Sequence, residues 1–149
     1  MSGKIEAICI SSEKGIVKTP VDQAELRFAH GIVGDAHAGD WHRQVSLLAT
    51  ESIAKMKAIL PELADGAFAE NIVTSGLEIK SLPIGTKLHL GDTVLELTQI
   101  GKECHYGCAI REATGDCVMP REGVFCRVLE GGIIRPGDTV TAEITATES

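Results

Sequence analysis

The sequence predicts a mainly β fold, a β-barrel with a few short helices inserted between its strands. Short apolar runs recur at intervals of about 8–12 residues, separated by turn-forming residues, as is typical of sandwiches and barrels. Sixteen glycines and five prolines supply those turns. Aromatic residues make up only 3% of the chain, so its core must be built from Ile, Leu, Val and Ala.

Each predicted strand is a short run in which apolar residues alternate with polar ones or stand together. Gly91-Asp92, between two such runs, is a hairpin signal. Lys18-Thr-Pro-Val21 is interpreted as a turn or a strand at a sheet edge. The predicted strands are residues 4–10, 24–29, 44–48, 71–74, 88–90, 93–100, 124–129 and 139–144.

One clear helix is predicted between Thr50 and Pro61. Thr50 is a suitable N-cap, and Ile53, Met56 and Leu60 follow it at helical spacing. Pro61 ends the pattern, because proline cannot continue a helix.

Composition limits the classes of protein that the chain can belong to. The 149 residues, 44% of them hydrophobic, suit a single domain spanning 1–149 with a core of about 4–144. A formal net charge of −7 argues against a nucleic-acid or anionic-membrane binder, since such proteins use a basic face. We find no apolar run long enough for a transmembrane helix and no apolar leader, and we expect a cytoplasmic protein. Five cysteines should then be mostly free thiols.

The most informative stretch lies near the C-terminal third of the chain. It reads Gly101-Lys-Glu-Cys-His-Tyr-Gly-Cys-Ala-Ile110, followed shortly by Gly115-Asp-Cys-Val-Met-Pro-Arg121. Three of the five cysteines fall here, among charged and polar neighbours, which is an unusual density for a loop that only connects strands.

Cys104 is the candidate nucleophile of this stretch, because it follows Lys102 and precedes His105. Nearby cations lower the pKa of a thiol and so favour the thiolate. A thiolate can attack a sulfur donor, hold the sulfur as a persulfide and pass it on. Cys108 or Cys117 could resolve a persulfide or a disulfide if the fold brings them close. The alternative is that all three are small residues of a loop.

Two groups of residues are alternative metal sites. Structural zinc normally uses paired C-x₂₋₄-C knuckles, and among Cys104, Cys108, Cys117 and Cys126 only the first pair has that spacing. Cys126 and Cys9 lie in apolar runs and are interpreted as small buried hydrophobes. The second group is the turn-rich loop 30–42, whose side chains suit a transition metal or simple turn capping. That loop holds His30, Asp35, His37, Asp40 and His42. We predict no resident metal.

Other familiar motifs are missing from the sequence. It has no Gly-x-Ser-x-Gly, no Gly-x-x-x-x-Gly-Lys-Ser/Thr and no Gly-x-Gly-x-x-Gly, so hydrolases with a nucleophile elbow, P-loop proteins and dinucleotide binders are poorly supported. Glu70-Asn71 is interpreted as a helix end or a polar anchor.

A series of short motifs follows in a fixed order along the chain. They are Gly31-Ile-Val-Gly-Asp-Ala-His37, His42-Arg-Gln-Val-Ser-Leu-Leu48, Glu70-Asn-Ile72 with Gly76, Ile84-Gly85 through Gly91-Asp-Thr-Val-Leu-Glu-Leu-Thr98, Cys104, Gly123-Val-Phe-Cys-Arg-Val-Leu129 and Gly137-Asp138. Each is weak alone, but their order over residues 4–144 resembles the MOSC domain. That module occurs at the C-terminus of molybdenum cofactor sulfurases and as small stand-alone proteins.

The resemblance implies a β-barrel and a role around the molybdenum cofactor or sulfur transfer. In the family, the counterpart of Cys104 is proposed to carry sulfur as a persulfide, and related members bind the anionic pterin cofactor, molybdopterin. Cys104 would then be the sulfur-accepting thiol, with Lys102 and His105 favouring its thiolate.

Several residues are candidates to hold such a cofactor. Arginine matches phosphate and other oxyanions bidentately, which favours Arg121 and Arg127, although Arg127 is equally well interpreted as a structural strand residue. Loop 34–42 would join them if the barrel brings it near residue 104. The remaining candidates are Asp35, His37 and His42 from that loop, and Asn71 from the Glu-Asn turn.

The resemblance also predicts partners. The chain holds no aminotransferase-like desulfurase domain, so we expect a cysteine desulfurase or other sulfur donor as a partner, together with molybdenum cofactor biosynthesis proteins. It also lacks the N-terminal β-barrel segment of molybdoenzyme members, so redox catalysis on its own is not expected. The alternatives are a non-catalytic module that binds cofactor or metal without sulfur transfer, and a zinc-stabilised structural domain.

Overall fold

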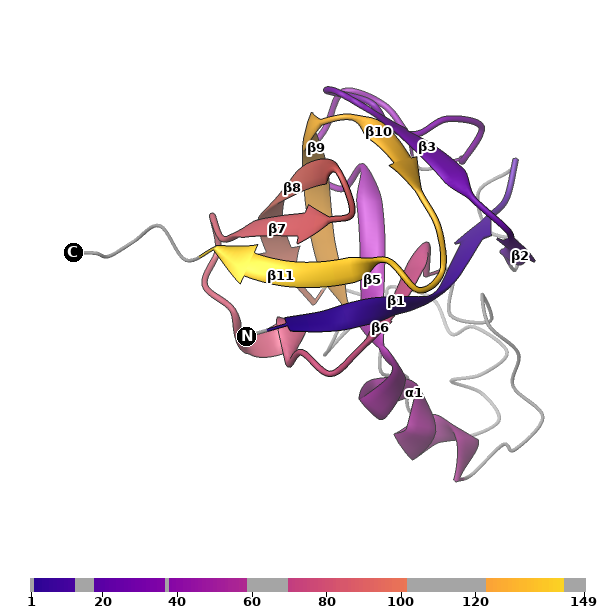
Figure 1. The fold of residues 1–149 in the computed structure, drawn as a ribbon, viewed down its shortest axis with the longest axis vertical. Coiled ribbons are helices and arrows are strands. Elements are labelled where there is room, and N and C mark those ends of the chain that lie inside the picture. The colour runs from indigo at the N-terminus through magenta and orange to yellow at the C-terminus, as the bar shows by residue number, and fades with distance from the viewer. Residues whose placement is uncertain (1, 13–17, 37, 59–69, 102–122, 144–149) are drawn as a thin grey trace.

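The computed structural model describes residues 2–12, 18–36, 38–58, 70–101 and 123–143. Within these residues, a sheet ordered β11-β7-β8-β9-β5-β6-β1-β2 closes through β11 and β1 into a barrel of seven strands (Figure 1). Closure pairs every barrel strand on both sides, so the sheet edge is left to β2. The strands are β1 (Ser2–Ile10), β2 (Thr19–Val21), β5 (Val45–Ala49), β6 (Ile72–Ser75), β7 (Lys87–Leu90), β8 (Thr93–Ile100), β9 (Val124–Glu130) and β11 (Thr139–Glu143).

Most neighbours in the barrel are antiparallel, and one pair is parallel. β5 runs parallel to β6, and the two pair Leu47 with Ile72. β1 pairs with β11 through its first residues, with β6 through its middle and with β2 through its last three residues. Pro20 lies in β2, where a missing N–H does not break the barrel.

A smaller sheet, ordered β10-β3-β4, lies beside β9 at one end of the barrel (Figure 1). Its strands are β3 (Ala24–Arg27), β4 (Gly31–Ile32) and β10 (Gly132–Ile134). The sharp turn from β9 into β10 uses Gly131, where a Cβ atom would lie 2.4 Å from the carbonyl oxygen of Leu26. The small sheet therefore carries the β3–β4 turn to the outer side of β9.

Helical structure is sparse in the described residues: α1 (Thr50–Lys57) directly follows β5, and η1 (Ile79–Ser81) is a single 3₁₀ turn. No helix among the described residues is long and apolar enough to cross a membrane. The barrel interior is aliphatic, as the composition predicts. It includes Ile5, Ile8, Leu47, Ile72, Leu88, Leu90, Leu95, Leu97, Val128 and Val140.

The predicted mainly β barrel is confirmed, and the eight predicted strands all have counterparts. Two short strands were not predicted. β4 and β10 contain two and three residues, too few to show alternation, and each begins with a glycine. The predicted helix starts at Thr50 as expected and continues to Lys57, and residues 59–69 lie outside the described part of the chain.

Candidate functional site

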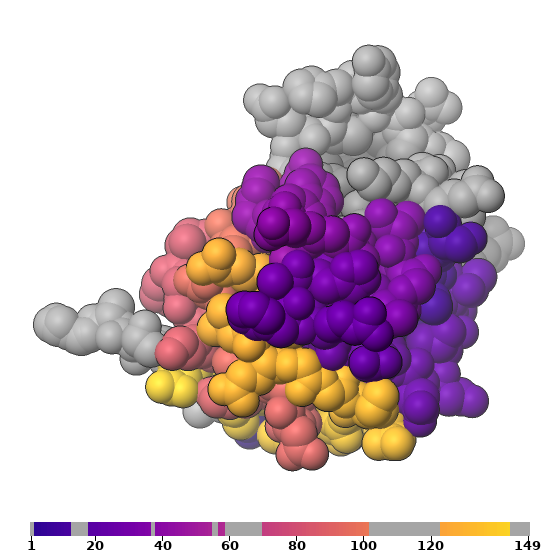
Figure 2. All heavy atoms as spheres, turned by 90° about the horizontal axis from the view of Figure 1, so that it is seen from above, coloured from indigo at the N-terminus to yellow at the C-terminus, as the bar shows by residue number. Residues whose placement is uncertain are grey.

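A cleft of about 460 Å³ lies between the β3–β4 turn, the loop before β5 and the outer side of β9. Its volume falls within the range of small-molecule pockets. Figure 2 shows β3 and the loop after β4 (purple) lying beside β9 and β10 (orange) on this side of the molecule. The cleft is lined by Phe28, Ala29, Asp40, Trp41, His42, Gln44, Arg127, Val128 and Leu129.

Two of the three aromatic side chains that the structure describes line this cleft. Phe28, Trp41 and Phe125 are the phenylalanine, tyrosine and tryptophan side chains that the structure describes. Phe28 and Trp41 line the cleft, and Phe28 is 67% exposed. The guanidinium carbon of Arg43 lies 4.7 Å from the Trp41 ring centroid and 5.7 Å from that of Phe125. Such contacts hold a cation between two rings and immobilise both.

The turn that presents Phe28 is strained. Ala29 has a φ of 57°, the left-handed conformation that residues with a Cβ rarely adopt. Its N–H donates a hydrogen bond to the carbonyl oxygen of Val128 at 3.2 Å, which ties the turn to β9. Strain of this kind is commonly stored at functional sites.

His42 joins the cleft to the end of β8. Its Nε2 lies 2.8 Å from Oε1 of Gln99, while Nε2 of Gln99 donates to the carbonyl oxygen of Gly101 at 2.6 Å. Because the Gln99 amide must donate to Gly101, its oxygen is the acceptor, and His42 must donate from Nε2. When the imidazole is neutral, its free lone pair is therefore on Nδ1. Thr98 Oγ1 also donates to the carbonyl oxygen of His42, so the residue is held at backbone and side chain.

The same point is where the cysteine-rich segment begins and ends. The N–H of Gly101 donates to the carbonyl oxygen of Gly123 at 2.7 Å. Gly101 has a φ of 74°, which favours glycine. Residues 102–122 connect these two glycines and lie outside the described part of the chain. Five predicted site residues lie outside the described part of the chain. They are Lys102, Cys104, His105 and Arg121 in this segment, and His37 in the loop before β5.

Arg127 projects from β9 into the cleft and pairs with a neighbour on β8. Its Nε donates to Oε1 of Glu96 at 2.6 Å, and the two residues are direct partners across the sheet. The Arg127 side chain is 53% exposed. The structure thus brings Arg127 and His42 to one cleft, and the ion pair leaves the Nη groups of Arg127 without a partner among the described residues.

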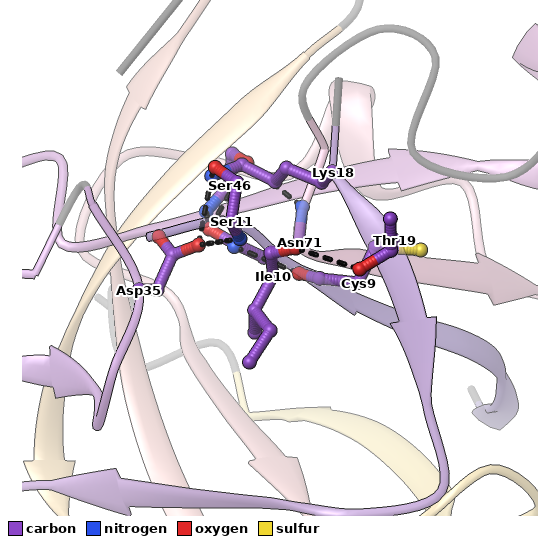
Figure 3. Close-up of polar contacts among 8 residues, drawn as sticks. All are labelled: Cys9, Ile10, Ser11, Lys18, Thr19, Asp35, Ser46 and Asn71. Atoms are coloured by element: carbon purple, nitrogen blue, oxygen red, sulfur yellow. Dashed lines mark hydrogen bonds and ion pairs between the residues drawn. The ribbon is translucent and has the colours of Figure 1, made fainter. Parts of the chain in front are cut away.

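Asp35 lies away from the cleft, in a buried ion pair that the sequence did not reveal. Its Oδ1 lies 2.8 Å from Nζ of Lys18, and both side chains have no solvent exposure (Figure 3). The same oxygen accepts the backbone N–H of Ser11 at 3.1 Å. Asp35 does not line the cleft, and its predicted contact with a cofactor stays a prediction.

Asn71 is also buried, and it ties three barrel strands together (Figure 3). Its Oδ1 accepts the N–H and the hydroxyl of Ser46 in β5, at 3.0 and 3.2 Å. Its Nδ2 donates to the carbonyl oxygen of Cys9 in β1 at 3.1 Å. The polar-anchor interpretation describes these contacts, whereas a role toward a cofactor stays a prediction.

The described cysteines are inert core residues, as interpreted from the sequence. Cys9 and Cys126 are buried in the core, with no exposed surface. Burial, and to a lesser extent the nearby charge of Glu96, raise the pKa of the Cys126 thiol far above its usual range. Among the residues described, no three His, Cys, Asp or Glu side chains gather as a metal site requires.

Cys126 should therefore resist alkylation while the protein is folded. An exposed thiol reacts faster as the pH rises toward its pKa, because the thiolate is the nucleophile. We expect Cys126 to show no such rise between pH 7 and about 9, and both Cys126 and the equally buried Cys9 to react only in denaturant. Peptide mapping after iodoacetamide treatment measures this. Rapid labelling of either residue in the folded protein would contradict their assignment to the core.

The residues that were not predicted from the sequence include Trp41 and Gln99 at the site and Lys18 of the buried pair. Trp41 is the single tryptophan of an aromatic-poor chain and stands beside His42, which was a usable signal. Gln99 sits at the end of a predicted strand, and its bond to His42 spans 57 residues, for which no local pattern exists. Lys18 precedes Thr19-Pro20 and gives no hint of burial.

The barrel defines the class of protein to which the chain is similar. It matches the YuaD protein from Bacillus subtilis with a TM-score of 0.79 at 19% identity, covering 95% of this chain and 96% of that one. It matches YiiM from Geobacillus stearothermophilus with a TM-score of 0.70 at 19% identity, over 95% and 75% of the two chains. YiiM from Escherichia coli gives 0.69 at 17%, over 99% and 72%. At such identities the likeness establishes the fold.

The family follows from the sequence match. The MOSC domain model matches residues 34–141, which is most of the chain, and the chain belongs to the MOSC domain family. The predicted resemblance is thus confirmed, and the protein is a molybdenum-cofactor-related MOSC protein. No curated protein sequence matches it.

Proposed function

We propose that the protein is a sulfur carrier that holds sulfur as a persulfide on Cys104 for molybdenum cofactor or metal–sulfur chemistry. The observation that carries this proposal is the chain of hydrogen bonds from His42 through Gln99 to Gly101. It ties the cleft to the residue from which the segment with Cys104 departs. The segment returns at Gly123, which is bonded to Gly101, so its two ends share this position.

The cleft has the chemistry that an anionic pterin needs. Phe28 and Trp41 offer faces for a planar ring, and aromatic stacking is worth about 0.5–1.5 kcal/mol beyond area burial. The Nη groups of Arg127 supply donors for an oxyanion, and Nδ1 of His42 adds a further donor when the imidazole is protonated. The cofactor, when bound, would supply the metal that accepts the sulfur. The residues described would hold its ring and its negative charge.

Sulfur transfer to Cys104 needs no oxidant. The Cys104 thiolate would attack the outer sulfur of a donor persulfide, such as that of a cysteine desulfurase. A new sulfur–sulfur bond forms on Cys104 as the donor's own sulfur–sulfur bond breaks, and the donor cysteine leaves as a thiolate. The transferred sulfur keeps its oxidation level, and the same exchange in reverse delivers it to an acceptor thiolate. Delivery to a metal as sulfide needs two electrons, which a second thiolate such as that of Cys108 or Cys117 would supply by attacking the Cys104 sulfur, forming a disulfide with Cys104 and releasing hydrosulfide. Lys102 and His105 are proposed to favour the attacking thiolate.

Intact mass measurement tests the proposal. After incubation with a cysteine desulfurase and cysteine, the native chain should gain the mass of one sulfur atom, and a reducing thiol should remove it. Cys104→Ser should gain none, because serine forms no persulfide. Cys108→Ser and Cys117→Ser are matched controls in the same segment and should still gain it.

Two outcomes would end the carrier proposal. In one, Cys104→Ser accepts as much sulfur as the native chain. In the other, neither the native chain nor any variant accepts sulfur. The second outcome favours the non-catalytic binding module, for which the aromatic cleft is the supporting observation. Titration with molybdopterin, followed by quenching of Trp41 fluorescence, then measures binding directly, since Trp41 is the single tryptophan.

A further inference from the structure

Lys18 and Asp35 form a fully buried ion pair in a fold whose barrel interior is aliphatic. Both side chains are fully buried, and the charged atoms lie 2.8 Å apart. Burying two charges carries a desolvation penalty of several kcal/mol per ion, and well-packed apolar residues often stabilise a fold as well or better. A contribution to stability alone therefore does not explain why the fold contains this ion pair. A role that an apolar pair would not perform would explain it.

The pair joins the start of β2 to the loop that leads into the cleft. Lys18 immediately precedes β2, and Asp35 opens the turn after β4. The N–H of Ala36 donates to the carbonyl oxygen of Ser11 at 2.8 Å, so the turn is also held to the end of β1. Figure 3 shows Lys18, Ser11 and Asp35 converging at this point.

From Asp35, short backbone hydrogen bonds continue to the cleft. The N–H of Ala38 donates to the carbonyl oxygen of Asp35 at 3.2 Å, and that of Gly39 donates to His30 at 2.6 Å. The N–H of Trp41 then donates to the carbonyl oxygen of Gly39 at 3.0 Å. At the far end, His42 is fixed by Gln99 and Thr98. The loop is thus anchored by the ion pair at one end and by β8 at the other.

We infer that Lys18 and Asp35 are positioning residues, which set the geometry of the loop that places Trp41 and His42 at the cleft. The charge pair does this better than an apolar pair would, because its directed hydrogen bonds fix where the turn begins. The importance of this positioning for activity rests on the proposed function of the cleft. The geometric claim is tested on the protein alone.

The decisive variant replaces both partners, Lys18→Met with Asp35→Leu. It removes both charges of the pair together, so the fold should be kept. Trp41 reports the loop because no other tryptophan interferes. We expect the Trp41 emission to shift to the red and its quenching by acrylamide to increase. The unfolding midpoint of the double variant should be no lower than that of the single variant Lys18→Met. The control removes the exposed pair of His89 and Glu143 on β7 and β11, through His89→Gln with Glu143→Gln, and should leave Trp41 unchanged.

Native-like emission and quenching of Trp41 in the folded double variant would overturn the inference. If the double variant does not fold, Asp35→Asn decides instead. Its amide oxygen can still accept from Ser11 and Lys18, so we expect a smaller change of the same sign, and no change would again overturn the inference. The sulfur-transfer test is independent of this readout. A native chain that accepts no sulfur refutes the proposed function, whereas an unmoved Trp41 refutes the positioning role.

Discussion

Replacing Lys18 alone with methionine should lower the free energy of unfolding by about 3–5 kcal/mol. The substitution keeps a long apolar stem but leaves the Asp35 carboxylate buried without its cation. The hydrogen bond from the N–H of Ser11 remains, yet a neutral donor does not replace the full positive charge of the ammonium beside the carboxylate. Urea denaturation at neutral pH, compared with the native chain, measures the loss.

An exposed ion pair provides the matched control. Arg27 and Glu25 lie 3.6 Å apart on β3, with side chains 58% and 49% exposed. Removal of a cation at such a site typically changes stability by less than about 1 kcal/mol, because water already solvates both charges. Arg27→Met should therefore be nearly neutral. If Lys18→Met lowers the free energy of unfolding no more than Arg27→Met does, the buried pair contributes little to stability and the expected loss is wrong.

The barrel could be predicted because each strand has one face toward a closed interior. β8 illustrates this, since buried Thr93, Leu95 and Leu97 alternate with more exposed neighbours. The closure itself could not be predicted in the same way. It rests on pairing of Gly3 with Val140, at opposite ends of the chain, and such long-range pairings leave no periodic trace. β4 and β10 were not predicted because strands of two or three residues are too short to show an alternation of apolar and polar residues.

The candidate site was predictable only in part. His42 and Arg127 were each a candidate to hold a cofactor, and the structure places both in the lining of the cleft. Asp35 was expected to line a pocket, but a carboxylate in a glycine-rich turn does not reveal that a lysine 17 residues earlier will be buried against it. Residue type indicates which chemistry a side chain can perform, whereas burial and partners depend on the finished fold.

Asn71→Ala should destabilise the barrel by about 3 kcal/mol. The substitution removes the acceptor of the Ser46 N–H and the donor to the Cys9 carbonyl group, both of them buried. Loss of one partner from a buried hydrogen bond costs about 1–3 kcal/mol, and the two losses fall on different strands. The midpoint of urea denaturation should drop, and hydrogen exchange at β1, β5 and β6 should accelerate together, since Asn71 joins all three.

A residue of β6, the strand that begins directly after Asn71, distinguishes the loss of hydrogen bonds from a general sensitivity of β6 to substitution. Thr74 is fully buried, and its Oγ1 has no hydrogen-bond partner among the residues that the structure describes. Thr74→Val keeps the shape of the side chain and removes the unpaired hydroxyl, so it should raise the free energy of unfolding by about 1 kcal/mol. The two substitutions thus shift stability in opposite directions. A loss at both positions would mean that β6 tolerates no change, and the anchoring role of Asn71 would then lack support.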